Sequence, residues 1–383
     1  TSCTPQRVIS PASTIAGGTF DIGTLESTGG IAAVIGGGGL TKSFVINDTQ
    51  LANVATDLHI SADVVGGASL SITRSGGGTL RLSGDNSALA STYIMTNGIL
   101  EVGSDTALGT GLVALQSSAN IIKAVGGPRT INNTINLDGN ISTLGDNLTL
   151  NGDILLSGDR AILVMDQTQT VTINGTIEEG IYGNRTFIKS GRGDLILTAA
   201  ATYSGETQVL DDGGRLILKD NGSILSSHTI RVRDRAQLIL DNTGTANLND
   251  RIRDDVFYVA DGGDLVLKAG TGGTTETIGF FNGASDLSSG ITVDSTAGDA
   301  HLLVKRTRLD GNADLAVNSI GGNLGTSGAN RVTFEEVPIN EGMTDGVTPR
   351  ITVRDAGGLT FGTYANVAQG LALVGLEAID YVT

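Results

Sequence analysis

The residues of this sequence whose types and spacing could support catalysis are adjacent carboxylates. Hydrolysis of a glycosidic bond needs two positioned carboxyl groups. Asp211-Asp212 precedes two glycines and is typical of a turn, whereas Asp254-Asp255 lies in an alternating charged run that is typical of a solvent-exposed face. The Asn-Thr-Asp, Gly-His-Gly and Arg-Ile-Lys motifs of polygalacturonases are absent. We therefore expect no catalytic residues and no enzymatic activity. The adjacent acidic pairs are Glu178-Glu179, Asp211-Asp212, Asp254-Asp255 and Glu335-Glu336.

The histidines and the single cysteine do not form a metal-binding pattern. His59, His228 and His301 lie far apart in the sequence, and none has a second His or Cys at the spacing of a transition-metal site. Cys3 alone can neither close an internal disulfide nor supply a multi-cysteine site. Asp, Asn and backbone carbonyl groups crowd the expected turns, and these are the ligands that calcium prefers. We expect no cofactor, with calcium as a possible ion because its preferred ligands crowd the turns.

One tripeptide could bind a receptor. Arg192-Gly193-Asp194 is the sequence that integrins recognise, and it falls in an expected turn before a strand. The same three residues also fill variable positions of an internal repeat, so a chance match is the alternative. The sequence names no other binding residue.

Charge and hydropathy exclude two classes of partner. Lys and Arg number 24 and Asp and Glu number 40, so the formal net charge is 24 − 40 = −16. A chain this acidic repels a phosphate backbone, and we expect no nucleic-acid partner. No run of 18 apolar residues occurs, so we do not expect this chain to span a membrane.

The elements that must position any site are short strands. Segments that alternate apolar and polar residues, such as 79–82, 195–197, 216–218, 237–240 and 265–267, are bounded by Gly, Asn and Asp. Their leucines recur every 20 to 27 residues: Leu80 and Leu100, then Leu195, Leu216, Leu238 and Leu265. A period of this length indicates a solenoid rather than a sandwich or barrel. The sequence therefore predicts an all-β fold, an elongated parallel β-helix or β-solenoid.

A longer repeat lies over the short one. Residues 74–84 (RSGGGTLRLSG) match 189–198 (KSGRGDLILT), each copy ends in a second strand at 98–102 or 214–218, and 262–267 is a weaker copy. With Tyr203–Thr207 (YSGET), this pattern resembles the autotransporter-associated β-strand repeat of bacterial autotransporter passengers. The resemblance implies export, a right-handed parallel β-helix and adhesive or display roles.

The domain organisation follows from the repeats. We predict a single continuous β-solenoid over residues 1–383, with N-terminal coils at 1–73, autotransporter-type repeats at 74–270, and C-terminal coils with a divergent end at 271–383. The segment Leu371–Val374 is apolar and shows no polar cap, so it could pair with another chain.

The sequence as a whole predicts a physical rather than a chemical role. We expect a secreted, non-catalytic structural β-solenoid of the bacterial cell surface or extracellular matrix, acting as an adhesin or spacer. Its expected partners are surface or host ligands, or other copies of itself in end-to-end fibres. The alternative is a polysaccharide-binding or polysaccharide-cleaving β-helix enzyme.

Overall fold

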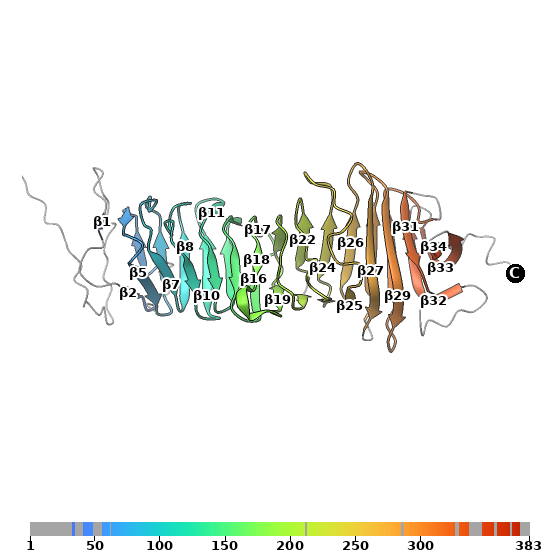
Figure 1. Cartoon of the computed structure of the whole chain (residues 1–383), viewed down its shortest axis with the longest axis horizontal. Coiled ribbons are helices and arrows are strands. Elements are labelled where there is room, and N and C mark those ends of the chain that lie inside the picture. Colours follow the sequence, from blue (N-terminus) through green and yellow to red (C-terminus); the bar gives the residue numbers. More distant parts are fainter. Residues whose placement is uncertain are drawn as a thin grey trace, which may run out of the picture. The chain divides into compact units, whose positions relative to one another are not determined.

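The structure is a computed structural model of the chain, shown in Figure 1. It describes residues 33–34, 41–48, 56–61, 63–210, 213–284, 287–325, 329–336, 347–355, 358–367 and 370–375. Cys3 and the pair Asp211-Asp212 lie outside the described residues. The chain divides into two compact units, Thr1–Gly152 and Asp153–Thr383, called here the N-terminal and C-terminal units. The domain boundaries expected from the repeats, after residues 73 and 270, stay predictions.

The N-terminal unit is built from parallel strands. One sheet has the order β2-β5-β7-β9-β12 and another the order β3-β6-β8-β10-β13, while β11 pairs with β14 and β1 with β4. Its strands are β1 (Ala33–Val34), β2 (Thr41–Val45), β3 (Leu58–Ile60), β4 (Val64–Val65), β5 (Ser71–Ser75), β6 (Thr79–Leu82), β7 (Thr92–Met95), β8 (Gly98–Val102), β9 (Val113–Leu115), β10 (Asn120–Ala124), β11 (Arg129–Ile131), β12 (Ile135–Leu137), β13 (Ile141–Gly145) and β14 (Leu148–Leu150).

The C-terminal unit continues the same construction in two longer parallel ladders. One ladder runs β16-β19-β21-β23-β25-β27-β29-β31, and the other runs β17-β20-β22-β24-β26-β28-β30-β32. Its elements are β15 (Ile154–Leu156), β16 (Arg160–Val164), β17 (Thr170–Ile173), β18 (Ile177–Glu178), the 3₁₀ helix η1 (Gly180–Tyr182), β19 (Phe187–Ser190), β20 (Asp194–Leu197), β21 (Thr207–Val209), β22 (Arg215–Lys219), β23 (Thr229–Arg233), β24 (Gln237–Asp241), β25 (Phe257–Asp261), β26 (Asp264–Lys268), β27 (Thr274–Gly283), β28 (Ser289–Asp294), β29 (Ala300–Leu309), β30 (Leu315–Ile320), β31 (Asn330–Phe334), β32 (Val347–Asp355), β33 (Gly358–Val367) and β34 (Gly370–Gly375).

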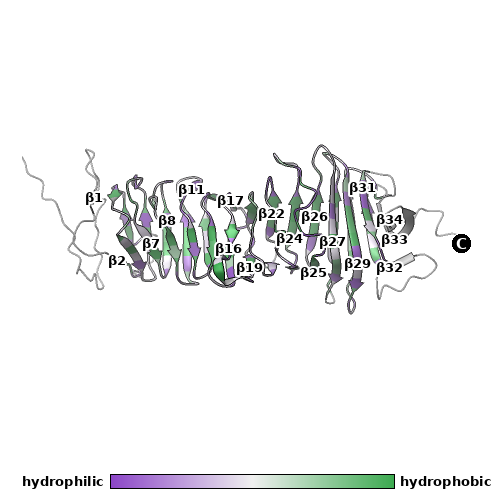
Figure 2. Ribbon diagram, in the orientation of Figure 1, coloured by the Kyte–Doolittle hydropathy of each residue, from purple (hydrophilic) through white to green (hydrophobic). Residues whose placement is uncertain are grey.

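The leucine spacing seen in the sequence is the coil length of the solenoid. Leu80 pairs directly with Leu100, and Leu195 is followed in register by Leu216, Leu238 and Leu265. Leu195 and the three leucines that follow it belong to one inward-facing column of the second ladder, and every residue of that column is at most 1% exposed. Hydrophobic and hydrophilic residues are interspersed along the strands (Figure 2), because successive side chains point to opposite faces. The predicted parallel β-solenoid is confirmed in both units. The column is Val171, Leu195, Leu216, Leu238, Leu265, Ile291, Val317 and Val353.

The basic residue that opens each repeat is fully buried at a turn. Arg74 donates a hydrogen bond from Nη1 to the carbonyl of Gly76 at 2.8 Å, and Lys189 donates from Nζ to the carbonyls of Ser190 and Gly191 at 2.9 and 2.6 Å. Turn carbonyls that face the interior need such partners. Both copies of the repeat therefore have a cationic side chain at this position for a structural reason, because it donates hydrogen bonds to the carbonyl groups of the turn.

The glycines of the repeat are required by close approach of neighbouring coils. Gly191 has φ +77°, and a Cβ there would lie 2.3 Å from the carbonyl oxygen of Val164. Gly214, one coil later, lies directly over the buried lysine, where a Cβ would be 2.7 Å from Lys189 Nζ and 2.0 Å from the carbonyl oxygen of Gly191. These spacings leave no room for a larger residue.

The parallel ladders end in antiparallel strands. β33 pairs antiparallel with β32 and with β34, and β34 also pairs antiparallel with β31. The apolar segment Leu371–Val374 is part of β34, which pairs along its length with β33 and at Leu371 and Ala372 with β31. Pairing of this segment with another chain stays a prediction.

Replacing the buried lysine tests the account of the turn. Lys189→Met keeps the length of the side chain and leaves two turn carbonyls without their donor, so we expect a loss of roughly 1–3 kcal/mol in the free energy of unfolding. Lys305→Met is the matched control, because Lys305 on β29 is only half-buried. Urea unfolding followed by circular dichroism gives both values. Equal effects of the two substitutions would contradict a specific role for Lys189.

Candidate binding surface

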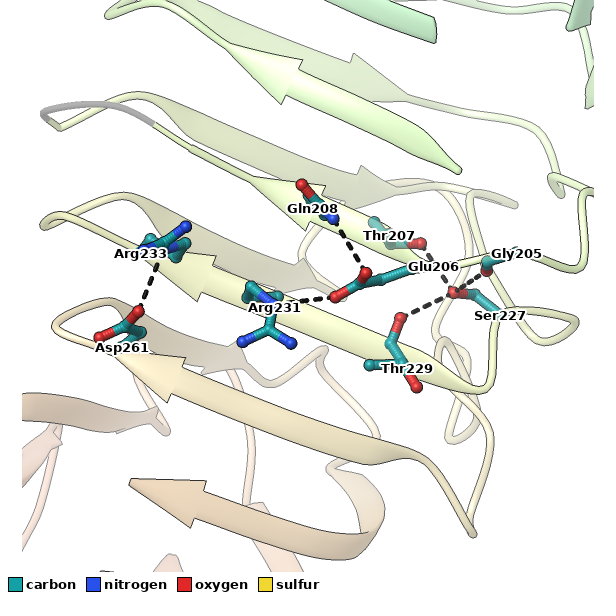
Figure 3. A network of polar contacts seen from close by, with 9 residues as sticks. All are labelled: Gly205, Glu206, Thr207, Gln208, Ser227, Thr229, Arg231, Arg233 and Asp261. Carbon is teal, nitrogen blue, oxygen red and sulfur yellow. Dashed lines mark hydrogen bonds and ion pairs between the residues drawn. The ribbon is translucent and has the colours of Figure 1, made fainter. Parts of the chain in front are cut away.

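A surface of connected polar side chains in the C-terminal unit lies on and beside β21, β23 and β25 (Figure 3). Inward-pointing residues of these strands fix its geometry, because Thr207, Ile230 and Tyr258 are fully buried and in register. The residues between them consequently point outward. Gln208 and Arg231 are register partners on this outer face, and so are Arg233 and Asp261.

Ion pairs cross this face from coil to coil. Glu206 accepts hydrogen bonds from Arg231 Nε at 3.0 Å and from Gln208 Nε2 at 2.9 Å, and Arg233 Nε lies 3.0 Å from Asp261 Oδ2. Because these pairs face solvent, each contributes only about 0–1 kcal/mol to stability. Their main effect is to hold the side chains in place and to neutralise the charge of the face.

A buried chain of hydroxyl groups supports the backbone beneath the face. The hydroxyl of Tyr203 lies 2.7 Å from Thr207 Oγ1, which donates to Ser227 Oγ at 3.0 Å. Ser227 Oγ in turn lies 2.8 Å from the carbonyl of Gly205 and 3.1 Å from that of Thr229. Burial raises the pKa of Tyr203, so its hydroxyl remains a donor. The repeat segment 203–207 is thus a support for the backbone around it.

A short loop beside the face is tied down by one carboxylate. Glu179 precedes η1 and accepts hydrogen bonds from the amides of Arg185 and Ser204 at 2.8 and 3.0 Å and from Ser204 Oγ at 2.7 Å. Burial alone would raise the pKa of Glu179, but these hydrogen bonds outweigh it and the pKa is lowered. Asn184, at φ 53°, donates its amide to Ser204 Oγ at 3.0 Å. Glu179 therefore positions both Asn184 and Ser204.

The loop and the face enclose an open hollow of about 400 Å³. Its lining consists of carboxylate, amide, hydroxyl and imidazole side chains and one glycine. A Cβ at Gly205 would lie 2.3 Å from the carbonyl of Arg185, so the backbone itself forms part of the wall. Such a surface can form hydrogen bonds with a polar ligand. The lining residues are Asp159, Asn184, Thr186, Ser204, Gly205, Glu206, His228 and Thr229.

The acidic pairs found in the sequence do not come together as a catalytic pair within the described residues. Glu179 anchors the loop, and Asp255 forms an ion pair with Arg253, which also donates to His228 Nε2 at 2.6 Å. Glu336 Oε1 lies 3.6 Å from Arg306 Nε. The acid whose pKa is raised furthest is Glu276, to about 8 by burial, but its side chain is fully enclosed in the core. A group without solvent access cannot exchange protons with a bound substrate.

The structure bears on the calcium prediction and on the predicted receptor-binding turn. No group of three or more His, Cys, Asp or Glu suited to a metal ion occurs among the residues that the structure describes, and the calcium prediction stays untested. Asp194 accepts hydrogen bonds from Arg215 Nε at 2.6 Å and Nη2 at 2.5 Å. Gly193 is buried and Arg192 is exposed. The receptor-binding turn Arg192-Gly193-Asp194 stays a prediction.

The fold defines a repeat protein of the parallel β-solenoid class. The model of the passenger-associated-transport-repeat family matches residues 72–102 and 187–218. Over 264 residues the chain is 30% identical to the Adhesin BmaC autotransporter of Brucella suis biovar 1 (strain 1330). That match covers 65% of this chain and 7% of the length of the adhesin. No solved structure matches the chain.

These comparisons confirm the resemblance to autotransporter passengers stated from residues 74–84, 189–198 and 203–207. The second matched repeat, 187–218, contains both the buried lysine and the support segment of the hollow. No helix among the described residues is long and apolar enough to cross a membrane.

The lowered pKa of Glu179 gives a pH dependence with a defined sign. Because the folded pKa lies below the ordinary value of 4.5, the hydrogen bonds of Glu179 are complete above that pH and are lost as the pH falls through the folded value. Amide NMR signals of Arg185 and Ser204 should therefore titrate with a midpoint below 4.5. Glu179→Gln should abolish this titration, and the exposed neighbour substitution Glu178→Gln should leave it intact. A midpoint at or above the ordinary value would contradict this assignment.

Proposed function

We propose that the chain is part of a cell-surface or secreted passenger whose role is adhesion, and that it performs no catalysis. The observation that carries the proposal is the combination of the passenger repeat with an outward-facing polar hollow, to which that repeat contributes Ser204, Gly205 and Glu206. The similarity to an autotransporter adhesin supports the same role. A stack of coils presents side chains in regular columns, which suits binding to an extended ligand.

The state of the described carboxylates supports a non-catalytic role. A general acid needs a raised pKa together with access to substrate. Glu276 has a raised pKa but no access to substrate. Burial also raises the pKa of Asp264, whose carboxylate accepts a hydrogen bond from Gln237. Glu206 at the surface is paired with Arg231 and Gln208. Of the two alternatives, polysaccharide binding agrees with the hollow better than polysaccharide cleavage.

Assembly into fibres stays a prediction. In the C-terminal unit, β34 pairs with β33 along its length and with β31 at Leu371 and Ala372, which leaves only part of one edge for another copy. We therefore place the adhesive surface on the outer face of the coils. A spacer role is compatible with the same fold.

Attachment assays test the proposed function. Beads coated with the purified chain should attach to host-cell monolayers several times more than beads coated with the heat-unfolded chain or with albumin. Incubation with a panel of polysaccharides should release no reducing sugar. Attachment equal to that of the albumin beads would contradict adhesion, and sugar release would contradict the absence of catalysis.

The Arg192-Gly193-Asp194 turn is tested in the same assay. Asp194→Ala removes the carboxylate that an integrin would need, and Arg215→Ala frees that carboxylate from its partner. Loss of attachment with the first substitution and gain with the second would assign adhesion to this turn. Unchanged attachment with both would exclude the turn as the adhesive element.

A further inference from the structure

Two aromatic side chains continue the outer column beyond the polar hollow. Thr229, which lines the hollow, is the register partner of Phe257, and Phe257 is the register partner of Phe280. The rings of Phe257 and Phe280 are stacked with centroids 5.1 Å apart and an angle of 26° between their planes. Phe257 is 40% exposed. An aromatic platform on the outside of a solenoid leaves apolar area in water, and nothing in the packing of the core requires it.

The platform and the hollow are contiguous. The amide of Phe257 donates to the carbonyl of His228 at 2.9 Å, and His228 lines the hollow. Side chains of register partners in a parallel sheet point the same way. From β19 to β27 the column crosses four intervals between strands, roughly 19 Å at about 4.8 Å per interval. This length suits an extended ligand that lies along the column.

The charges of this region argue against an anionic ligand. Arg231 is paired with Glu206, and Arg253, which contacts His228, is paired with Asp255. Asp159 adds a carboxylate to the lining, which would repel sulfate, phosphate or a uronic acid. A lipid or an amphipathic helix would need an apolar groove, whereas the hollow is polar.

A ligand ring with one apolar face and several hydroxyl groups matches both the Phe257–Phe280 platform and the polar hollow. Its apolar face can stack on an aromatic ring, and its hydroxyl groups can bond to carboxylate, amide and hydroxyl side chains. We propose that the hollow and the Phe257–Phe280 platform form one binding site for a neutral oligosaccharide. One sugar ring stacks on Phe257, and neighbouring sugars bond to Asn184, Glu206 and Thr229. This assignment rests on the proposed adhesive function and names the ligand class of its surface.

Binding of defined oligosaccharides to the full chain tests the proposal. The probes for isothermal titration calorimetry are cellohexaose, laminarihexaose and mannohexaose, with a heparin hexasaccharide as the anionic comparison. At least one neutral hexasaccharide should bind, and more tightly than the heparin fragment. Failure of all three neutral probes, or preferential binding of heparin, would overturn the proposal.

Matched variants locate the site. Phe257→Ala and Phe280→Ala should each weaken binding at least about tenfold. Phe257→Tyr, which keeps the platform, should stay within about threefold of the unchanged chain. Leu225→Ala, at a side chain 45% exposed and outside the column, should have no effect. Undiminished binding by Phe257→Ala would overturn the proposal.

A second variant tests the hollow without disturbing the fold. Asn184→Gly suits the φ of 53° and removes only the amide side chain from the hollow, so it should weaken binding with an unchanged thermal midpoint. Unchanged binding by this variant would contradict a role for the hollow. Bead attachment distinguishes the adhesive function from the oligosaccharide site. If the chain attaches to cells but binds no neutral hexasaccharide, the oligosaccharide site is refuted and adhesion is not. If the chain binds a hexasaccharide but does not attach, adhesion alone is refuted.

Discussion

The structure depends on parallel, in-register stacking of coils. Each inward residue must fit above the one before it, which is why Leu195, Leu216 and Leu238 occupy a single buried column. The apolar area that this column removes from water stabilises the fold at roughly 25 cal/mol per Å². Because every coil contacts its neighbours, the same register also determines which outward side chains lie side by side. The core thereby sets the order of the surface.

Buried polar groups mark the places where the stacking has to accommodate a turn. Lys189 bonds to turn carbonyls, and Arg251 plays a comparable part, donating to Asn242, to the carbonyl of Gly222 at 2.6 Å and to the carbonyl of Ala246 at 3.2 Å. A buried cation is stable only with such partners. The turn carbonyls are thus satisfied by buried side chains rather than by residues of the outer face. Because its exposed pairs contribute little to stability, Glu206 can be replaced without loss of the fold.

The strands and the solenoid class could be predicted from the sequence, because alternation and leucine spacing are local patterns. The turn function of Arg74 and Lys189 was not predicted, since their carbonyl partners are seen only when the turn is folded. Phe257 and Phe280 were missed for another reason. They lie 23 residues apart, and only the register of β25 with β27 brings them together. That register depends on loop lengths between coils, which vary and have no pattern of their own.

Disulfide trapping tests the register most directly. In a Cys3→Ser background, Gln208→Cys combined with Arg231→Cys joins two register partners on the outer face. Partners in neighbouring strands lie about 4.8 Å apart, within the range of a disulfide. We expect this pair to oxidise readily. Gln208→Cys combined with Val232→Cys should not oxidise, because Val232 points into the core. Preferential closure of the second pair would contradict the register, and with it the arrangement of the hollow and the aromatic platform.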